Sequence, residues 1–379
     1  MNMNLNIISL NVPYPPDYGG MIDTYYRIHS LHNLGVRVHL HCFEYGRQHS
    51  KELESLCETT CYYPRKSGLL RQFSTIPYIV SSRKSEILLD NLIRNDYPIL
   101  FDGLHSTFFI NHPALSNRKK LVRLHNIEHK YYHALADNEK NFLKKGYFLI
   151  ESAKLKRYEK VLREADYILP ISVSDHEYFI NEYHNSICMA PFHPFYELKS
   201  LTGTGEYVIF HGDLSVNENY LISDSLISNV FSKIPYKCII AGKDPPGFIK
   251  THASRYSNIL VISNPDNDQM TKLIVNAQIH ILPALAANGF KLKLLMALYA
   301  GRHCLVNPVV EEYAPVKNLF HVANTNAEIL NTIHMLMKEP FTYEMILERQ
   351  RVLSENFDVR NNAMKLIELA FNDSSKGKG

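Results

Sequence analysis

The segment from Ile281 to Arg302 has the residue types and the spacing of an anion-binding site. A strand ends at Pro283, a loop of small residues follows, and a helix then begins with Lys291 in its first turn and ends at Gly301. A cation near a helix N-terminus opposes the helix dipole, so its presence there suggests a bound anion held by backbone N–H groups and by Lys291. Lys293 is two positions further on, points to a different face, and is expected to be solvated.

A second group of polar residues, His125-Asn126-Ile127-Glu128-His129, directly follows a predicted strand. Such side chains bond sugar hydroxyls, and the histidines titrate near neutral pH. A surface loop could have the same composition, but the position after a strand favours a site containing His125 and Glu128.

Glycines follow strands at three further places. Gly19 and Gly20 precede a helix, where they would let a diphosphate or sugar approach the backbone closely or would simply form a tight turn. His211 and Gly212 offer the same two interpretations. Lys243 lies in a glycine loop, where it is either a counter-charge for phosphate or an ordinary solvated lysine.

The composition places these motifs in an ordinary globular chain of 379 residues, with 45% hydrophobic and 21% charged residues and a net charge of +3. That charge is too small to indicate nucleic-acid binding. The first residues read as a strand without signal-peptide features, and no apolar run is long enough to span a membrane. Six scattered cysteines indicate reduced thiols, so we expect a cytoplasmic protein.

Apolar strands alternate with helical patterns twice along the chain, which predicts an α/β fold of two Rossmann-like domains facing across a cleft. Prolines and small residues mark a linker between the two halves. We expect one Rossmann-like domain over residues 1–195 and a second over 206–345. The C-terminal helices, 346–372, are expected to cross back and pack on the first domain.

The order of these motifs resembles that of retaining glycosyltransferases of the GT-B fold, family 4, over nearly the whole chain. Gly19-Gly20 falls at that family's amino-terminal glycine loop, and His125-Asn126-Ile127-Glu128 is similar to its His-Asn-x-Glu segment. His211-Gly212 with Asn217 is similar to its Gly…Asn loop. The run from Gly289 to Arg302 is similar to its Gly-Thr-Arg/Lys-Leu-Lys…Ala-Gly-Arg helix.

The resemblance implies a UDP- or GDP-linked sugar donor, a glycan or lipid-linked acceptor, and no metal or other cofactor. It also implies that residues 1–195 form the acceptor-side domain and 206–345 the nucleotide-sugar-binding domain. The departing diphosphate would take the acceptor proton, stabilised by Lys291, Lys243 and helix N–H groups, while His125 and Glu128 contact donor sugar or acceptor. The implied site residues are His125, Lys291 and Glu128 for catalysis, and Gly19, Gly20, His211, Gly212, Lys243, Asn288, Gly289 and Phe290 for the donor. The chain departs from the family where Met296 and Asn288 replace two carboxylates, one of which binds the donor ribose.

A basic helix over residues 141–163, and a second basic and apolar segment over 65–84, raise the possibility of peripheral contact with the inner face of a membrane. Because Glu151, Glu159 and Glu164 dilute the charge of the helix, an ordinary solvated face is the slightly favoured interpretation.

Other function classes stay open. A nucleotide-sugar 2-epimerase shares the fold, but the motif loops lack converging carboxylates. The lost carboxylates also allow a catalytically degenerate scaffold or binding subunit, although Lys291, Gly289 and His125 are intact. A dinucleotide oxidoreductase would need a Gly-x-Gly-x-x-Gly after the first strand, which is missing.

Overall fold

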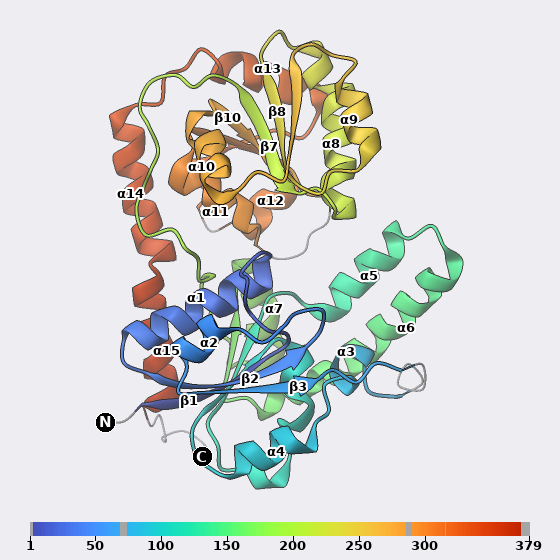
Figure 1. The fold of residues 1–379 in the computed structure, drawn as a ribbon, viewed down its shortest axis with the longest axis vertical. Coiled ribbons are helices and arrows are strands. Elements are labelled where there is room, and N and C mark those ends of the chain that lie inside the picture. The colour runs from blue at the N-terminus through green and yellow to red at the C-terminus, as the bar shows by residue number, and fades with distance from the viewer. Residues whose placement is uncertain (1–2, 69–73, 286–289, 315, 373–379) are drawn as a thin grey trace. The chain divides into compact units, whose positions relative to one another are not determined.

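The computed structural model describes residues 3–68, 74–285, 290–314 and 316–372, and within them it divides into two compact units. The first unit runs to Pro194 and resumes at Phe357, and the second covers Phe195–Asn356. Figure 1 shows each unit as a sheet with helices on both faces.

The first unit contains a six-stranded parallel sheet of order β3-β2-β1-β4-β5-β6 in the described chain. Its strands are β1 (Asn4–Ser9), β2 (Arg37–Glu44), β3 (Thr59–Pro64), β4 (Ile99–Asp102), β5 (Lys120–Leu124) and β6 (Tyr167–Pro170). Its helices are α1 (Gly19–Asn33), α2 (Lys51–Leu56), α3 (Tyr78–Ser81), α4 (Glu86–Ile93), α5 (Glu128–Asn138), α6 (Phe142–Tyr158), α7 (Val173–Tyr183) and α15 (Val359–Phe371), with 3-10 helices at Leu104–Phe109, Pro113–Leu115 and Glu159–Glu164.

The second unit repeats this architecture with a six-stranded parallel sheet of order β12-β11-β10-β7-β8-β9 among the described residues. Its strands are β7 (Val208–Asp213), β8 (Cys238–Lys243), β9 (Ile259–Ser263), β10 (Ile279–Ile281), β11 (His303–Val306) and β12 (His321–Val322). Its helices are α8 (Asn217–Asn229), α9 (Gly247–Ala253), α10 (Asn267–Asn276), α11 (Leu292–Ala300), α12 (Pro308–Tyr313), α13 (Asn326–Leu336) and α14 (Tyr343–Phe357), with 3-10 helices at Phe231–Lys233 and Lys317–Leu319.

Local sequence explains where several helices begin and end. Helix α1 ends before Gly35, whose φ of +80° is the left-handed conformation that closes helices. Helix α7 begins at Ser172, whose hydroxyl accepts the N–H of Asp175 at 3.1 Å. A left-handed glycine and a serine cap therefore define these two ends.

Helix α15 returns to the first unit, as predicted. Its buried residues Val359, Ala363, Leu366 and Ala370 belong to the apolar core formed by one face of the first sheet together with α1. Figure 1 shows α15 beside α1 on that face. The imidazole of His193 lies 2.8 Å from the carbonyl oxygen of Phe357, so the two crossings of the chain into this unit are tied together.

Helix α14 corrects the expected boundary at residue 346. Its buried Arg349 donates to the carbonyl oxygens of Gly301 and Arg302 at 2.6 and 2.5 Å and to the hydroxyl of Ser200 at 3.1 Å. These bonds hold α14 on the second unit, so the segment expected to pack on the first unit is divided at Phe357.

Each strand order places a switch point at the centre of its sheet. In the first unit the chain runs outward in both directions from the pair β1 and β4, and in the second from β7 and β10. Ligands of open parallel sheets bind where such neighbouring strands end, because their connections leave toward opposite faces. We therefore expect ligands to bind at the carboxyl ends of these four strands.

Candidate functional site

In the first unit, His125 directly follows β5, and its ring is fixed by a carboxylate from α1. Its Nε2 lies 3.1 Å from the carboxylate of Asp23 and 4.0 Å from that of Asp102, which ends β4. The side chain of His125 is 13% exposed, whereas both aspartates are buried. The Asp23 contact takes up Nε2 and leaves Nδ1 as the ring atom that can meet a ligand.

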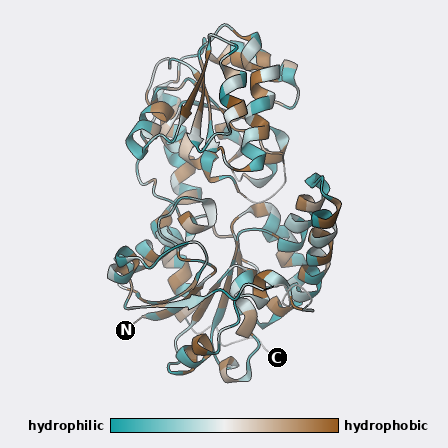
Figure 2. Cartoon of the chain, turned by 45° about the vertical axis from the view of Figure 1, so that its right-hand side comes forward, coloured by the Kyte–Doolittle hydropathy of each residue, from teal (hydrophilic) through white to brown (hydrophobic). Residues whose placement is uncertain are grey.

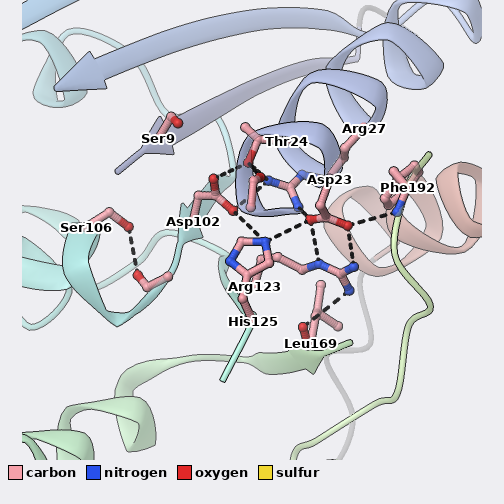
Figure 3. Close-up of polar contacts among 12 residues, drawn as sticks. Ser9, Asp23, Thr24, Arg27, Asp102, Ser106, Arg123, His125, Leu169 and Phe192 are labelled. Atoms are coloured by element: carbon pink, nitrogen blue, oxygen red, sulfur yellow. Dashed lines mark hydrogen bonds and ion pairs between the residues drawn. The ribbon is translucent and has the colours of Figure 1, made fainter. Parts of the chain in front are cut away.

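Asp23 belongs to a network of buried charges (Figure 3). Its carboxylate lies 2.5 Å from Arg27 and 2.6 Å from Arg123, and it also accepts the N–H of Phe192 at 2.9 Å. Burial alone would raise the pKa of Asp23, but the guanidinium groups of Arg123 and Arg27 hold it well below its ordinary value.

Arg27 and Arg123 connect this network to the rest of the sheet. Arg27 also pairs with Asp102 at 2.7 Å, and the Thr24 hydroxyl donates to Asp102 at 2.5 Å. Arg123 donates to the carbonyl oxygen of Met189 at 2.6 Å, in the segment that leaves the unit. Sequence reasoning missed this network, although its signals were an arginine inside an apolar strand and an Asp23–Arg27 pair at helical spacing.

Asp23, Asp102 and His125 each offer one possible metal-ligand atom, all within 4.8 Å of one another. Both carboxylates already face Arg27, and Asp23 also faces Arg123, so charge within the network is balanced. A divalent cation would meet two buried guanidinium groups at short range. The cluster therefore does not fit a metal ion.

Glu128 is the first residue of α5 and is buried, with a side chain 6% exposed. Burial raises its pKa to about 8, although nearby Arg83 opposes this. The Nδ1 atom of His105 lies 3.9 Å away, and burial holds the pKa of His105 well below its ordinary value. Both groups are thus neutral at pH 7, and Glu128 carries a proton that it can donate.

Gly103, directly after β4, has a backbone conformation that requires glycine. Its φ is +75°, and a Cβ there would lie 3.0 Å from Nδ1 of His105 and 3.2 Å from the Leu10 side chain. Glycine is therefore required for β4 to turn beneath the loop that follows β1.

Gly19 and Gly20 form the start of α1, and neither has a positive φ. The first turn of α1 contains no acidic residue, and no side chain caps it. These glycines are therefore not needed for a turn with positive φ. The other interpretation, that they let a ligand approach the N-terminus of α1 closely, fits them better.

In the second unit, Lys291 is the N-cap residue of α11, after β10. Its Nζ lies 3.4 Å from the carboxylate of Glu218, at the start of α8 after β7. The other carboxylate oxygen of Glu218 accepts the N–H of Leu285 at 2.8 Å. Glu218 thus joins the two strand ends of the switch point, a role that its sequence position alone did not indicate.

Lys293 is partly buried, so the expectation that it is solvated was wrong. Its Nζ donates to the side-chain oxygen of Asn219 at 3.1 Å and lies 4.9 Å from the centre of the Phe210 ring. Burial lowers its pKa to about 8, and burial also lowers the pKa of Lys291. Lys291 and Lys293 therefore both lie near the carboxylate of Glu218 at a helix N-terminus.

Other predicted donor residues of this unit lie around the same sheet edge. His211 is buried against His280, and burial lowers its pKa to about 3, so its side chain belongs to the core beneath the site. Gly212, the penultimate residue of β7, lies beside Gly242, and a Cβ on Gly242 would lie 1.7 Å from the Gly212 carbonyl oxygen. Lys243 is exposed at the end of β8, on the opposite side of β7 from β10.

Three positions complete the predicted set. Phe290 is buried, at 7% exposure. Asn288 and Gly289 lie outside the described residues. Met296 lies within α11, where the resembled family has a carboxylate.

Comparisons with known proteins support the architecture. No family model matches the chain. A Klebsiella pneumoniae protein described as an uncharacterized 44.6 kDa protein in the cps region is 26% identical over 354 residues, covering 87% of this chain and 89% of that protein.

Solved structures match over nearly the full chain. TarM of S. aureus has a TM-score of 0.68 at 11% identity, covering 98% of this chain and 99% of TarM. HepE of Anabaena in complex with UDP and glucose has a TM-score of 0.66 at 12% identity, covering 97% and 98%. Arabidopsis thaliana UGT89C1 complexed with UDP-L-rhamnose has a TM-score of 0.58 at 15% identity, covering 98% and 100%. These neighbours are glycosyltransferases, and the chain shares their fold: it is a GT-B protein with two Rossmann-like domains.

Proposed function

We propose that the chain is a glycosyltransferase that moves a sugar from a UDP- or GDP-linked donor to a glycan or lipid-linked acceptor. The observation that carries the proposal is the pair of partly buried lysines, Lys291 and Lys293, near the carboxylate of Glu218 at the start of α11. Two partly buried cations at a helix N-terminus favour binding of an anion, and a donor diphosphate has the required charge.

Donor binding in this scheme rearranges the ion pair. The diphosphate takes the place of the Glu218 carboxylate at Lys291 and accepts hydrogen bonds from the N–H groups at the start of α11. Gly212 and Lys243 face the diphosphate from β7 and β8. Glu218 is then released to accept ribose hydroxyls, which compensates for the methionine at position 296. Asn288, Gly289 and Phe290, which lead into α11, and the backbone of His211 complete the proposed donor site.

The first unit contributes the residues at the sugar. Nδ1 of His125 contacts the donor sugar or acceptor because Asp23 holds the opposite ring atom. Glu128 acts as a neutral donor of a hydrogen bond at pH 7. Gly19 and Gly20 leave the N-terminus of α1 open to the diphosphate or sugar.

The proposed reaction follows family 4 and retains the anomeric configuration. The bond between the anomeric carbon and the diphosphate oxygen breaks, the acceptor oxygen bonds to the same face, and the acceptor proton goes to the departing diphosphate. Lys291 and Lys293 stabilise the charge that forms on the diphosphate, and this scheme uses no metal ion.

The structural neighbours support this choice, since HepE was solved with UDP and glucose and UGT89C1 with UDP-L-rhamnose. The cps region of the Klebsiella relative supports a place in cell-surface polysaccharide synthesis. We further propose that the protein acts in the cytoplasm. Within the described residues, no helix has both the length and the apolar character needed to cross a membrane.

The proposal is tested by following release of nucleoside diphosphate from UDP- and GDP-sugars by the purified chain. Lys293→Ala removes one charge-assisted contact to the diphosphate and is expected to lower kcat/KM by about 10- to 100-fold. His125→Ala is expected to lower kcat while nucleotide affinity stays unchanged. The matched control is Lys250→Ala, which replaces an exposed lysine of α9.

Two results would contradict parts of the scheme. Nucleotide binding without any turnover would identify a binding or scaffold subunit instead of an enzyme. With a competent acceptor, the coupling constant of the anomeric proton in the first-formed product reports its configuration, and inversion would refute the retaining mechanism.

A further inference from the structure

The helical hairpin of α5 and α6 exposes apolar side chains on one face of α6. The two helices pack antiparallel at one edge of the first unit (Figure 1). Phe142 and Leu143 at the tip are 79% and 69% exposed, and Leu149 and Ile150 are 40% and 59% exposed. At 100° per residue these four positions fall on one side of the helix.

The opposite side of α6 packs onto the protein. Ser152 and Leu155 are buried, and the Phe148 ring contacts that of Tyr132 on α5. The helix therefore has an inner apolar face that packs on the unit and an outer apolar face that is exposed among the described residues. Figure 2 shows hydrophobic and hydrophilic segments intermixed on this hairpin.

The charge exposed on α6 is entirely basic. Lys144, Lys145, Lys156 and Arg157 are exposed. Glu151 is buried, where it accepts the N–H of Tyr78 at 2.7 Å and pairs with Lys154 at 2.8 Å. Glu159, just beyond the helix, is buried against His129. Two of the glutamates expected to dilute the basic charge therefore do not face solvent.

We propose that the outer face of α6 lies on an anionic lipid bilayer. An apolar stripe bordered by Lys145 and Lys156, which lie along its edge at 100° per residue, matches the boundary between acyl chains and anionic headgroups, because lysine stems extend along apolar surface while their amines stay in water. A second copy of this chain fits less well, since a twofold contact would bring the same lysines together. The proposal is independent of the donor site.

The chain contains no tryptophan, which makes a direct test possible. Phe142→Trp places the chain's single tryptophan at the hairpin tip. As a matched control, Phe248→Trp places a single tryptophan at a half-exposed position of α9. With vesicles of phosphatidylglycerol and phosphatidylcholine, emission of the first variant is expected to shift to shorter wavelength and to be quenched by brominated acyl chains. The second is expected to show neither effect.

Vesicle flotation of the full chain supplies the second measurement. Lys145→Glu with Lys156→Glu is expected to weaken binding by about fivefold or more per lysine, and 0.5 M salt is expected to weaken it as well. Lys250→Glu should leave it unchanged. Equal binding to pure phosphatidylcholine, or an unshifted tip fluorophore on anionic vesicles, would overturn the proposal. So would a tip fluorophore that shifts without vesicles as protein concentration rises, since that outcome identifies self-association.

Discussion

The substitution Asp23→Asn tests whether the charge network of the first unit is a structural requirement. The carboxylate of Asp23 faces Arg27, Arg123 and His125 and accepts the N–H of Phe192, and it is 1% exposed. Removing its charge leaves two buried guanidinium groups with only Asp102 to balance them. Breaking a buried ion pair from one side costs about 3–5 kcal/mol, so we expect a loss of that order in the free energy of unfolding of this unit.

Hydrogen exchange measured by mass spectrometry separates the two units in this experiment. Peptides from α1, β4 and β5 should exchange much faster in Asp23→Asn, while peptides from β7 to β9 report the second unit as an internal reference. Asp17→Asn removes an ion pair between the exposed carboxylate of Asp17 and the partly buried Arg47 and is the matched control, expected to cost less than about 1 kcal/mol.

The pH dependence of the same variant has a defined sign. The pKa of Asp23 is lowered in the folded protein, so its stabilising contribution is complete above its unfolded value and is lost as pH falls through the folded value. The difference between the wild-type protein and Asp23→Asn should therefore be constant at neutral pH and shrink below about pH 4. A loss no larger than that of Asp17→Asn at pH 7 would refute the reasoning.

Three further predictions concern single positions. Gly242→Ala places a Cβ against the Gly212 carbonyl oxygen and should lower the free energy of unfolding by about 1–3 kcal/mol or more, whereas Gly247→Ala, with open space around its Cβ, should not; denaturant titration compares them. Lys293→Met should raise the free energy of unfolding of the ligand-free protein at pH 7. Because the pKa of Lys293 is lowered to about 8, this gain should shrink between about pH 8 and 10, and guanidinium unfolding at both pH values measures it. Glu128→Gln should match the wild-type protein in stability near pH 4 and become the more stable of the two as pH rises toward 8, because burial raises the pKa of Glu128 to about 8. Parallel thermal melts across this range measure the difference, which would stay constant if Glu128 were ionised throughout.

The fold was predictable from sequence because its signals are local and repeated. Apolar strands such as β1 and β5 alternate with helices, and each half has this pattern, which predicts two parallel sheets. The return of the C-terminal helices to the first unit was expected with the GT-B fold. The assignment of α14 was not, because it depends on what Arg349 bonds, a contact between residues far apart in the chain.

Residues that follow strands could be placed in the fold from the sequence. His125 and Glu128 lie in the segment after β5, and Lys291 lies at the N-cap of α11, after β10. Asp23 and Glu218 were missed because they come from helices, and only the folded chain brings them to His125 and Lys291. The depth of a lysine below the surface also depends on tertiary packing, which is why Lys293 was assigned to solvent.

The central claim is that the second unit binds a nucleoside diphosphate at Lys291 and Lys293. Isothermal titration calorimetry of the purified chain with UDP, GDP, ADP and CMP tests it most directly, with Lys291→Ala and the surface control Lys250→Ala measured beside the wild-type protein. We predict saturable binding of UDP or GDP that is weakened by about 10-fold or more in Lys291→Ala and unchanged in Lys250→Ala. Absence of binding for every nucleotide, or equal affinity in Lys291→Ala, would contradict the account.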